Sequence, residues 1–314
     1  MTRETLQAIE VHGAAVDLSA RAKFRLSGAD RVRYLNGQVT NDVRKATATS
    51  AVYACITNAK GRIEADVFIH ATPDGYLLVD AEAALRDTLA ARLDRYIVAD
   101  DVTLEDVTDA WCLWHVFGPL QDAFQKWWAG NEAVFSPVKC KRFGIAGLDF
   151  WAPNLNSLGA LPSTLLSPAD AETLRIVRGL PRWPSELTVD TFPQEAGIEA
   201  TAMDFSKGCY IGQEVLSRIK MSGKMPRRLV RFSVVGFPRE DATSFADQAR
   251  LKFCTGNVGA PTEVGEVTSI AWHPVLDRVV GLGYVRHSVY DSDSLLLASA
   301  DLTRIFANVE FSLL

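Results

Sequence analysis

The order of apolar runs between residues 50 and 118 constrains the fold of this chain most strongly. Residues 52–58 and 63–71 alternate apolar and polar side chains with the two-residue period of half-buried strands. The hairpin signal Asp74-Gly75 then leads into a third apolar run at 76–79. These runs predict three consecutive antiparallel strands.

A helix and further strands follow this first group. Leu85, Leu89 and Leu93 share one helix face, and we expect Asp80 to cap that helix. Two more strands are predicted, at 102–107 and 111–117. The resulting order lacks the strict strand–helix alternation of a doubly wound sheet. It therefore favours an antiparallel α+β subdomain near residues 50–118.

The pattern changes after Pro226. Val, Ile, Leu and Phe gather in short segments with glycines between them, at 229–235, 263–271, 279–286 and 307–313. This pattern predicts an all-β domain at residues 227–314, which we expect to be a small barrel. Residues 1–226 then form a separate module, with helices expected near 168–178 and 210–221. The length of 314 residues is suited to two domains.

Composition excludes several classes of protein. The 33 Lys and Arg against 38 Asp and Glu give a net charge of −5, which disfavours a general nucleic-acid coat. The five cysteines form no CxxC pair and the five histidines no HExxH motif, so we expect neither a metal site nor a disulfide framework. No apolar run approaches the roughly 20 residues that span a bilayer, and the first residues do not resemble a signal or transit peptide. We expect a cytoplasmic protein without membrane or DNA contacts, in which only a local basic patch could touch RNA.

The segment Lys207-Gly208-Cys209-Tyr210-Ile211-Gly212-Gln213-Glu214 carries the most specific signal. Gly208 allows a sharp turn, and Cys209 precedes a predicted amphipathic helix. The partial positive charge of a helix N-terminus and the nearby Lys207 both favour a thiolate, so Cys209 is the cysteine placed to be reactive. The alternative is a small packing residue in a tight turn.

With Arg218, this segment resembles the signature of the YgfZ-type folate-binding proteins, which are iron–sulfur cluster assembly and repair factors related to the glycine cleavage T-protein. Three further blocks resemble the same family: Tyr34-Leu35-Asn36-Gly37-Gln38-Val39-Thr40-Asn41-Asp42, Pro193-Gln194-Glu195-Ala196-Gly197-Ile198 and residues 265–286. The resemblance implies a T-protein-like α+β module of antiparallel sheets and helices, in two intertwined subdomains, followed by the C-terminal barrel.

The resemblance also implies a function. We expect a tetrahydrofolate-binding accessory factor for the assembly or repair of iron–sulfur enzymes, including tRNA-modifying ones. The alternative is a folate-dependent aminomethyl- or methyltransferase, and whether the chain is an enzyme stays open. The T-protein usually has an acidic residue at the position of Cys209, which favours the cluster-assembly branch.

The expected cofactor is tetrahydrofolate or a one-carbon derivative, and four residues are its expected contacts. By resemblance, Asp66 corresponds to a carboxylate near the folate's reactive nitrogen, Tyr53 to a tyrosine of the same cavity, and Asp149 to a glutamate that recognises the pterin. On an alternating strand Glu64 and Phe68 would share the face of Asp66. Glu195 either contacts the cavity or caps a turn.

Basic residues offer further candidates. Arg175 or Arg178 could replace a folate-binding arginine that has no clear counterpart here. A basic cluster surrounds Pro226 and could meet an anionic folate tail or RNA, or form a solvated linker; it comprises Lys220, Lys224, Arg227, Arg228 and Arg231.

Overall fold

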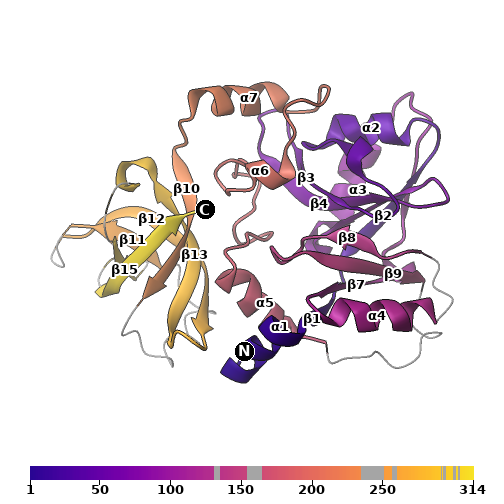
Figure 1. Cartoon of the computed structure of the whole chain (residues 1–314). Helices are drawn as coiled ribbons and strands as arrows, with labels where there is room; N and C mark the ends of the chain where they lie inside the picture. Colours follow the sequence, from indigo (N-terminus) through magenta and orange to yellow (C-terminus); the bar gives the residue numbers. More distant parts are fainter. Residues whose placement is uncertain are drawn as a thin grey trace. The chain divides into compact units, whose positions relative to one another are not determined.

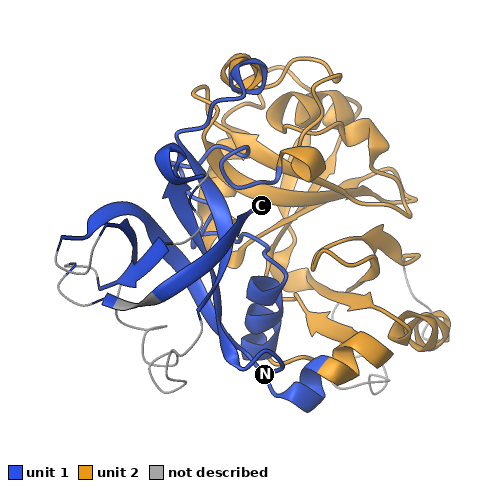
Figure 2. Ribbon diagram, turned by 60° about the vertical axis from the view of Figure 1, so that its left-hand side comes forward, with its two compact units in different colours: residues 1–6, 168–198, 219–314 blue, residues 7–167, 199–218 orange. Residues whose placement is uncertain are grey.

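The computed structural model describes residues 1–130, 135–153, 165–234, 251–256, 260–290, 292, 295–299, 302 and 305–314. The chain forms two compact units, coloured separately in Figure 2. Unit 1 comprises residues 1–6, 168–198 and 219–314, and unit 2 comprises residues 7–167 and 199–218. None of the described helices is long and apolar enough to cross a membrane.

Unit 2 contains a five-stranded antiparallel sheet in the order β3-β4-β5-β2-β6 (Figure 1). Its strands are β2 (Ala22–Ser27), β3 (Val52–Thr57), β4 (Ile63–Ala71), β5 (Leu77–Ala81) and β6 (Thr103–Asp106). Residues opposite one another in adjacent strands point to the same face. One face is apolar and buried, with Phe24, Val52, Ala54, Val67, Ile69 and Val79.

The other face of this sheet is polar. Asp66 lies opposite Cys55, Phe68 lies opposite both Tyr53 and Asp80, and Asp80 lies opposite Lys23. Polar residues in the alternate positions of four neighbouring strands therefore meet on one surface. This surface carries two of the predicted site residues.

A second antiparallel sheet in unit 2 has the order β1-β7-β9-β8. Its strands are β1 (Ala14–Asp17), β7 (Trp111–Phe117), β8 (Val138–Cys140) and β9 (Gly147–Pro153). The helix α4 (Leu120–Ala129) buries Phe124 and Trp128 against Trp114 and Phe150 of this sheet. That aromatic core fixes the sheet that carries Asp149.

Short helices complete the described parts of the fold. They are α1 (Arg3–His12), α2 (Arg31–Gln38), α3 (Arg86–Asp94), α5 (Pro168–Val177), α6 (Glu199–Ala202) and α7 (Gln213–Ser222). Four single-turn 3₁₀ helices are η1 (Val43–Lys45), η2 (Ala83–Leu85), η3 (Thr108–Ala110) and η5 (His287–Val289).

Unit 1 contains a closed barrel in the order β10-β13-β12-β11-β14-β15. Its strands are β10 (Arg227–Val234), β11 (Lys252–Thr255), β12 (Thr262–His273), β13 (Arg278–Arg286), β14 (Leu295–Ala298) and β15 (Ile305–Leu313). Gly281 and Gly283 of β13 leave room for the rings of Phe232 and Phe253, because a Cβ at either glycine would lie 2.5–2.6 Å from a ring atom.

The predicted fold class of antiparallel sheets and helices with a C-terminal barrel is confirmed. The predicted cap at Asp80 is wrong, because Asp80 lies inside β5, and α3 begins only at Arg86. The predicted helix at 210–221 begins three residues later, at Gln213. The division into domains at residue 226 stays a prediction.

Candidate functional site

Lys207 joins two of the sequence blocks inside unit 2. Its Nζ donates to the backbone carbonyls of Asn36, Val39 and Asn41 at 2.6, 2.6 and 2.7 Å. Burial lowers the pKa of this lysine to about 8. The ammonium group is thus fully engaged by the end of α2 and the loop after it, so Lys207 holds the motif in place.

Further contacts fix the segment between Lys207 and α7. The backbone N–H of Ile211 donates to the carbonyl of Gly37 at 3.2 Å, and the carbonyl of Ile211 accepts from Thr57 Oγ1 at 2.6 Å. Gly212, and not Gly208, has the left-handed backbone, with φ +86°. A Cβ at Gly212 would lie 2.6 Å from the carbonyl oxygen of Asn58, so a side chain is excluded there.

Cys209 lies in this anchored segment with its side chain exposed. Of the other cysteines, Cys55, Cys140 and Cys254 are buried and Cys112 is partly buried. The helix α7 begins only after Gly212, and Lys207 Nζ donates to three backbone carbonyl groups. The reactivity expected of this thiol stays a prediction. What distinguishes Cys209 is an accessible thiol on a loop held at both ends.

The other motif residues lie around this loop. Tyr210 is buried, with its ring 5.1 Å from Lys207 Nζ. Glu214 and Arg218 form an exposed i,i+4 ion pair on α7, a kind of pair that contributes little to stability.

Asp66 is the second element of the site. The Tyr53 hydroxyl donates to Asp66 Oδ2 at 3.2 Å, whereas Oδ1 is buried and has no partner among the described residues. Burial raises the pKa of Asp66 to about 6. The Tyr53 and Phe68 rings lie beside it, with centroids 4.7 Å apart. A β-bulge separates Glu64 from these residues, and its carboxylate pairs with Arg92 of α3 at 2.6 Å.

Asn41 connects the two elements. The side-chain Nδ2 of Asn41 donates to the backbone carbonyl of Tyr53 at 2.9 Å, and the backbone carbonyl of Asn41 accepts from Lys207 Nζ. The structure therefore attaches the Tyr53–Asp66 pair and the Cys209 loop to one residue of the block at 34–42.

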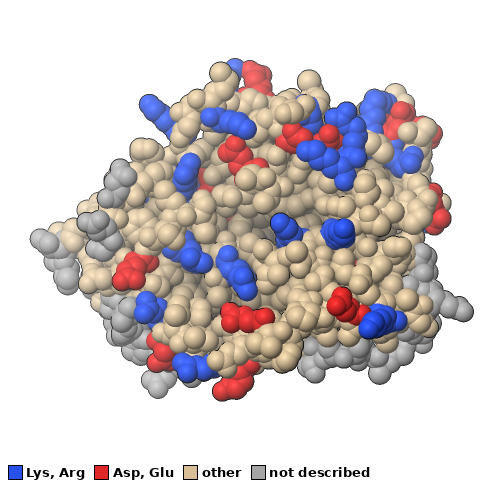
Figure 3. Space-filling view, in the orientation of Figure 1, with Lys and Arg blue, Asp and Glu red and all other residues tan. Residues whose placement is uncertain are grey.

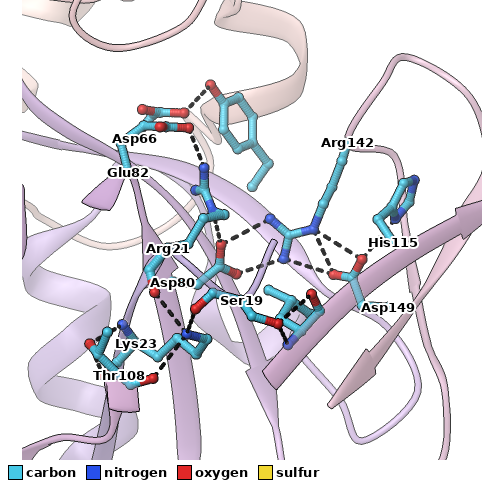
Figure 4. A network of polar contacts seen from close by, with 12 residues as sticks. Ser19, Arg21, Lys23, Asp66, Asp80, Glu82, Thr108, His115, Arg142 and Asp149 are labelled. Atoms are coloured by element: carbon cyan, nitrogen blue, oxygen red, sulfur yellow. Dashed lines mark hydrogen bonds and ion pairs between the residues drawn. The ribbon is translucent and has the colours of Figure 1, made fainter. Parts of the chain in front are cut away.

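A buried charged network lies next to Asp66 (Figure 4). It comprises Arg21, Asp80, Glu82, His115, Arg142 and Asp149. Arg142 donates to Asp80 at 2.6 and 2.9 Å and to Asp149 at 2.8–3.0 Å. Its guanidinium lies over the Phe68 ring, 4.1 Å from the centroid. Arg142 therefore links the two sheets of unit 2 and supports the aromatic wall beside Asp66.

Asp149 belongs to this network, and its side chain is only 1% exposed. Its oxygens accept from Arg142 and from His115 Nδ1, the latter at 2.8 Å. Burial opposes its ionisation, but Arg142 and His115 hold the pKa of Asp149 well below its ordinary value. Asp149 would have to give up one of these partners to bind a pterin.

Glu195 and Arg175 lie in unit 1. Glu195 accepts from the backbone N–H of Phe192 at 3.1 Å and pairs with Arg227 at 3.4 Å. Arg175 pairs with Glu172 and the buried Glu186. Both residues belong to unit 1, whereas Asp66 belongs to unit 2, and their contact with a folate stays a prediction. The bond from the Phe192 N–H to Glu195 is that of a turn cap.

The basic cluster around Pro226 is partly engaged within unit 1. Arg227 pairs with Glu195 and lies over the Tyr284 ring, and Arg228 lies over the Tyr290 ring. On the face drawn in Figure 3, basic and acidic side chains are interspersed. Within the described residues, no group of three or more His, Cys, Asp or Glu could hold a metal ion.

Residues 1–154 match the family model of the GCVT N-terminal domain. The chain is related to the glycine cleavage T-proteins. Its fold is that of the aminomethyltransferase T of Bartonella henselae, with a TM-score of 0.72 at 16% identity over 96% of this chain and 86% of that one. The predicted family relationship is confirmed.

Two curated relatives differ in their described roles. The chain is 26% identical over 280 residues to the mitochondrial iron-sulfur cluster assembly factor IBA57 homolog of Yarrowia lipolytica, covering 74% of this chain. The match spans only 58% of that relative's length. The aminomethyltransferase of Halalkalibacterium halodurans is 28% identical over 293 residues, covering 83% of this chain and 78% of the relative.

Replacing Lys207 by methionine should lower the free energy of unfolding by about 3 kcal/mol, because three carbonyls lose a charged donor. Denaturant unfolding measures this change, and limited proteolysis should show earlier cleavage near residues 205–212. The exposed Lys60, replaced in the same way, is the matched control. Equal stability of the two variants would contradict the anchoring role of Lys207.

Proposed function

We propose that this protein binds tetrahydrofolate, or a one-carbon derivative of it, and acts as an accessory factor in the assembly or repair of iron–sulfur enzymes, including tRNA-modifying ones. The observation that carries the proposal is the buried Asp66, whose Oδ1 has no partner within the described part of the chain, and its connection through Asn41 to the loop that exposes Cys209. The relationship to T-proteins supports the folate part, and the similarity to the cluster assembly factor supports the role.

The residues around Asp66 are suited to a reduced folate. A pterin presents N–H donors along a flat, largely apolar ring. Asp66 Oδ1 would accept one of these N–H groups, and the Tyr53 and Phe68 rings would contact the ring. A pKa of about 6 leaves Asp66 mostly ionised at pH 7 and able to accept. Bound tetrahydrofolate would supply a nucleophilic nitrogen that carries one-carbon units.

Cys209 would act at the exposed end of the site. One thiolate occupies a single ligand position, whereas a stable cluster ordinarily takes four. Among the described residues, no group of three or more His, Cys, Asp or Glu could hold a metal ion. The proposed contact is a transient one, shared with an iron–sulfur client. A redox role and the acceptance of a reactive intermediate are alternatives for the same thiol. A reducing compartment would keep it free.

Replacing Cys209 by alanine should abolish rescue of a strain that lacks this protein, as measured by the activity of an iron–sulfur enzyme in that strain. The Cys112→Ala variant is the matched control, since Cys112 is the other cysteine that is not fully buried. Both proteins should accumulate equally. Full rescue by Cys209→Ala would remove the thiol from the proposal.

Aminomethyl transfer is the second candidate function. It is favoured by the aminomethyltransferase relative, which matches over more of its own length than the assembly factor does. Asp66 would then hold the folate nitrogen and assist proton transfer. Purified protein would release ammonia from an aminomethyl donor in the presence of tetrahydrofolate, and Asp66→Asn would lose this turnover. Binding without turnover would favour the accessory role.

A further inference from the structure

Two buried side-chain atoms of opposite character lack hydrogen-bond partners among the residues that the structure describes. They are Arg21 Nη2 and Asp66 Oδ1. Figure 4 shows the carboxylates of Asp66 and Glu82 side by side next to the Arg21 guanidinium. Burial raises the pKa of Asp66, and Arg21 is the charged group that opposes this rise most strongly. The two free atoms therefore belong to neighbouring, interacting groups.

The rest of each side chain is fixed by other bonds. Arg21 donates from Nε to Asp80 at 2.5 Å and from Nη1 to Glu82, and its side chain is 11% exposed. Asp66 Oδ2 accepts from the Tyr53 hydroxyl. Each group thus keeps one hydrogen-bonding position, a donor on Arg21 and an acceptor on Asp66. A buried position of this kind is costly unless something fills it.

The complement of this pair is a ring edge with an acceptor beside an N–H donor. The tetrahydropterin ring has such an edge, where the O4 carbonyl oxygen lies beside N5–H. We propose that Arg21 donates to O4 and Asp66 accepts from N5–H, so that the protein selects reduced folates with an unsubstituted N5. This inference rests on the proposed function and adds to it the edge that is recognised and the arginine that recognises it.

If Arg21 and Asp66 bind this edge, the protein should prefer folates with an unsubstituted N5 and folates with a 4-oxo group. A methyl group on N5 removes the donor to Asp66, so 5-methyltetrahydrofolate should bind at least about tenfold more weakly than tetrahydrofolate. 10-Formyltetrahydrofolate keeps N5–H and should bind comparably to tetrahydrofolate. A 4-amino analogue, tetrahydroaminopterin, presents a donor to Arg21 and should also bind about tenfold more weakly.

Substitutions of Arg21 and Asp66 test separately which residue causes which ligand preference. Arg21→Lys keeps a cation for Asp80 and Glu82 but has no second Nη, so it should lose the preference for the 4-oxo ligand. Asp66→Asn should lose the preference for N5–H. Arg25→Lys is the matched control, because Arg25 lies in β2 and pairs with Glu105. A ratio of two affinities does not depend on how much of a variant is folded.

Anaerobic calorimetry of the full chain with these four ligands is the test. The wild type should show both preferences, Arg25→Lys should keep them, and Arg21→Lys should lose the 4-oxo preference. Equal binding of all four ligands by the wild type, or an unchanged 4-oxo preference in Arg21→Lys, would overturn the inference and leave the proposed function standing. If the wild type bound none of them at about 1 mM, the proposed function itself would fail.

Discussion

Replacement of Arg142 by methionine is expected to lower the free energy of unfolding at pH 7 by about 3–5 kcal/mol, the typical loss when one partner of a buried ion pair is removed. Arg142 is the shared partner of Asp80 and Asp149, whose side chains are both about 1% exposed. Without the guanidinium, Asp149 keeps the bond from His115, and Asp80 keeps the ion pair with Arg21. Two carboxylates would then be buried with less compensation.

The pH dependence separates this cause from a simple packing loss. Burial opposes ionisation, yet Arg142 and its neighbours hold the pKa values of Asp80 and Asp149 below their ordinary range. In the wild type this contribution is fully present above pH 4 and is lost only as the pH falls through the lowered pKa values. In Arg142→Met, burial is no longer opposed by the guanidinium and raises the pKa of both carboxylates, so they take up protons between pH 7 and pH 4 and part of the deficit is relieved. The deficit of Arg142→Met should therefore be large at pH 7 and smaller near pH 4.

Thermal unfolding of Arg142→Met and of Lys141→Met at both pH values measures this effect. Lys141 is exposed and adjacent in sequence, so its replacement should change stability little. A deficit in Arg142→Met that is the same at pH 4 and pH 7 would contradict the electrostatic role of Arg142.

Asp66→Asn is expected to unfold at a higher temperature than the wild type at pH 7.5 while losing folate binding. Burial raises the pKa of Asp66 from an ordinary 3.8 to about 6, and this difference corresponds to about 3 kcal/mol when the group is ionised. The folded protein holds its proton more tightly than the unfolded chain. The contribution of Asp66 is thus most favourable below pH 4 and is lost as the pH rises through 6.

The gain in melting temperature of Asp66→Asn should therefore be near zero at pH 4 and grow up to about pH 7. Asp74→Asn, in the exposed turn between β4 and β5, is the matched control and should show no such pH dependence. An Asp66→Asn protein that was less stable than the wild type at pH 7.5 would show that the carboxylate stabilises the fold and is not strained by its burial.

Strands with clear alternation were predictable from the sequence, and strands rich in charge were not. The runs at 52–58 and 63–71 correspond to β3 and β4. β2 contains Lys23, which is buried because its Nζ donates to the carbonyls of Ser19, Arg21 and Thr108. Asp80 was predicted to cap a helix, but it lies inside a strand because the guanidinium groups of Arg21 and Arg142 pair with it there. Both arginines are distant in sequence, so the local pattern gives no sign of this pairing. Tertiary pairing overrides local pattern at both residues.

The candidate site was predictable in part. Tyr53, Asp66 and Cys209 were named from the sequence, and the structure connects them through Asn41. The partners Arg21 and Arg142 were missed, because no spacing relates an arginine in a loop to carboxylates of other strands. The one available signal was the acidic residue in the apolar run Leu77-Leu78-Val79-Asp80-Ala81, since a buried carboxylate requires a cation.

Titration of tetrahydrofolate into the wild type and into Asp66→Asn under anaerobic conditions tests the central claim most directly. The account predicts saturable binding to one site in the wild type, and affinity reduced at least about tenfold in Asp66→Asn because a neutral amide replaces the charged carboxylate that accepts the N–H. Absence of binding by the wild type at about 1 mM ligand, or equal affinity of the two proteins, would contradict it.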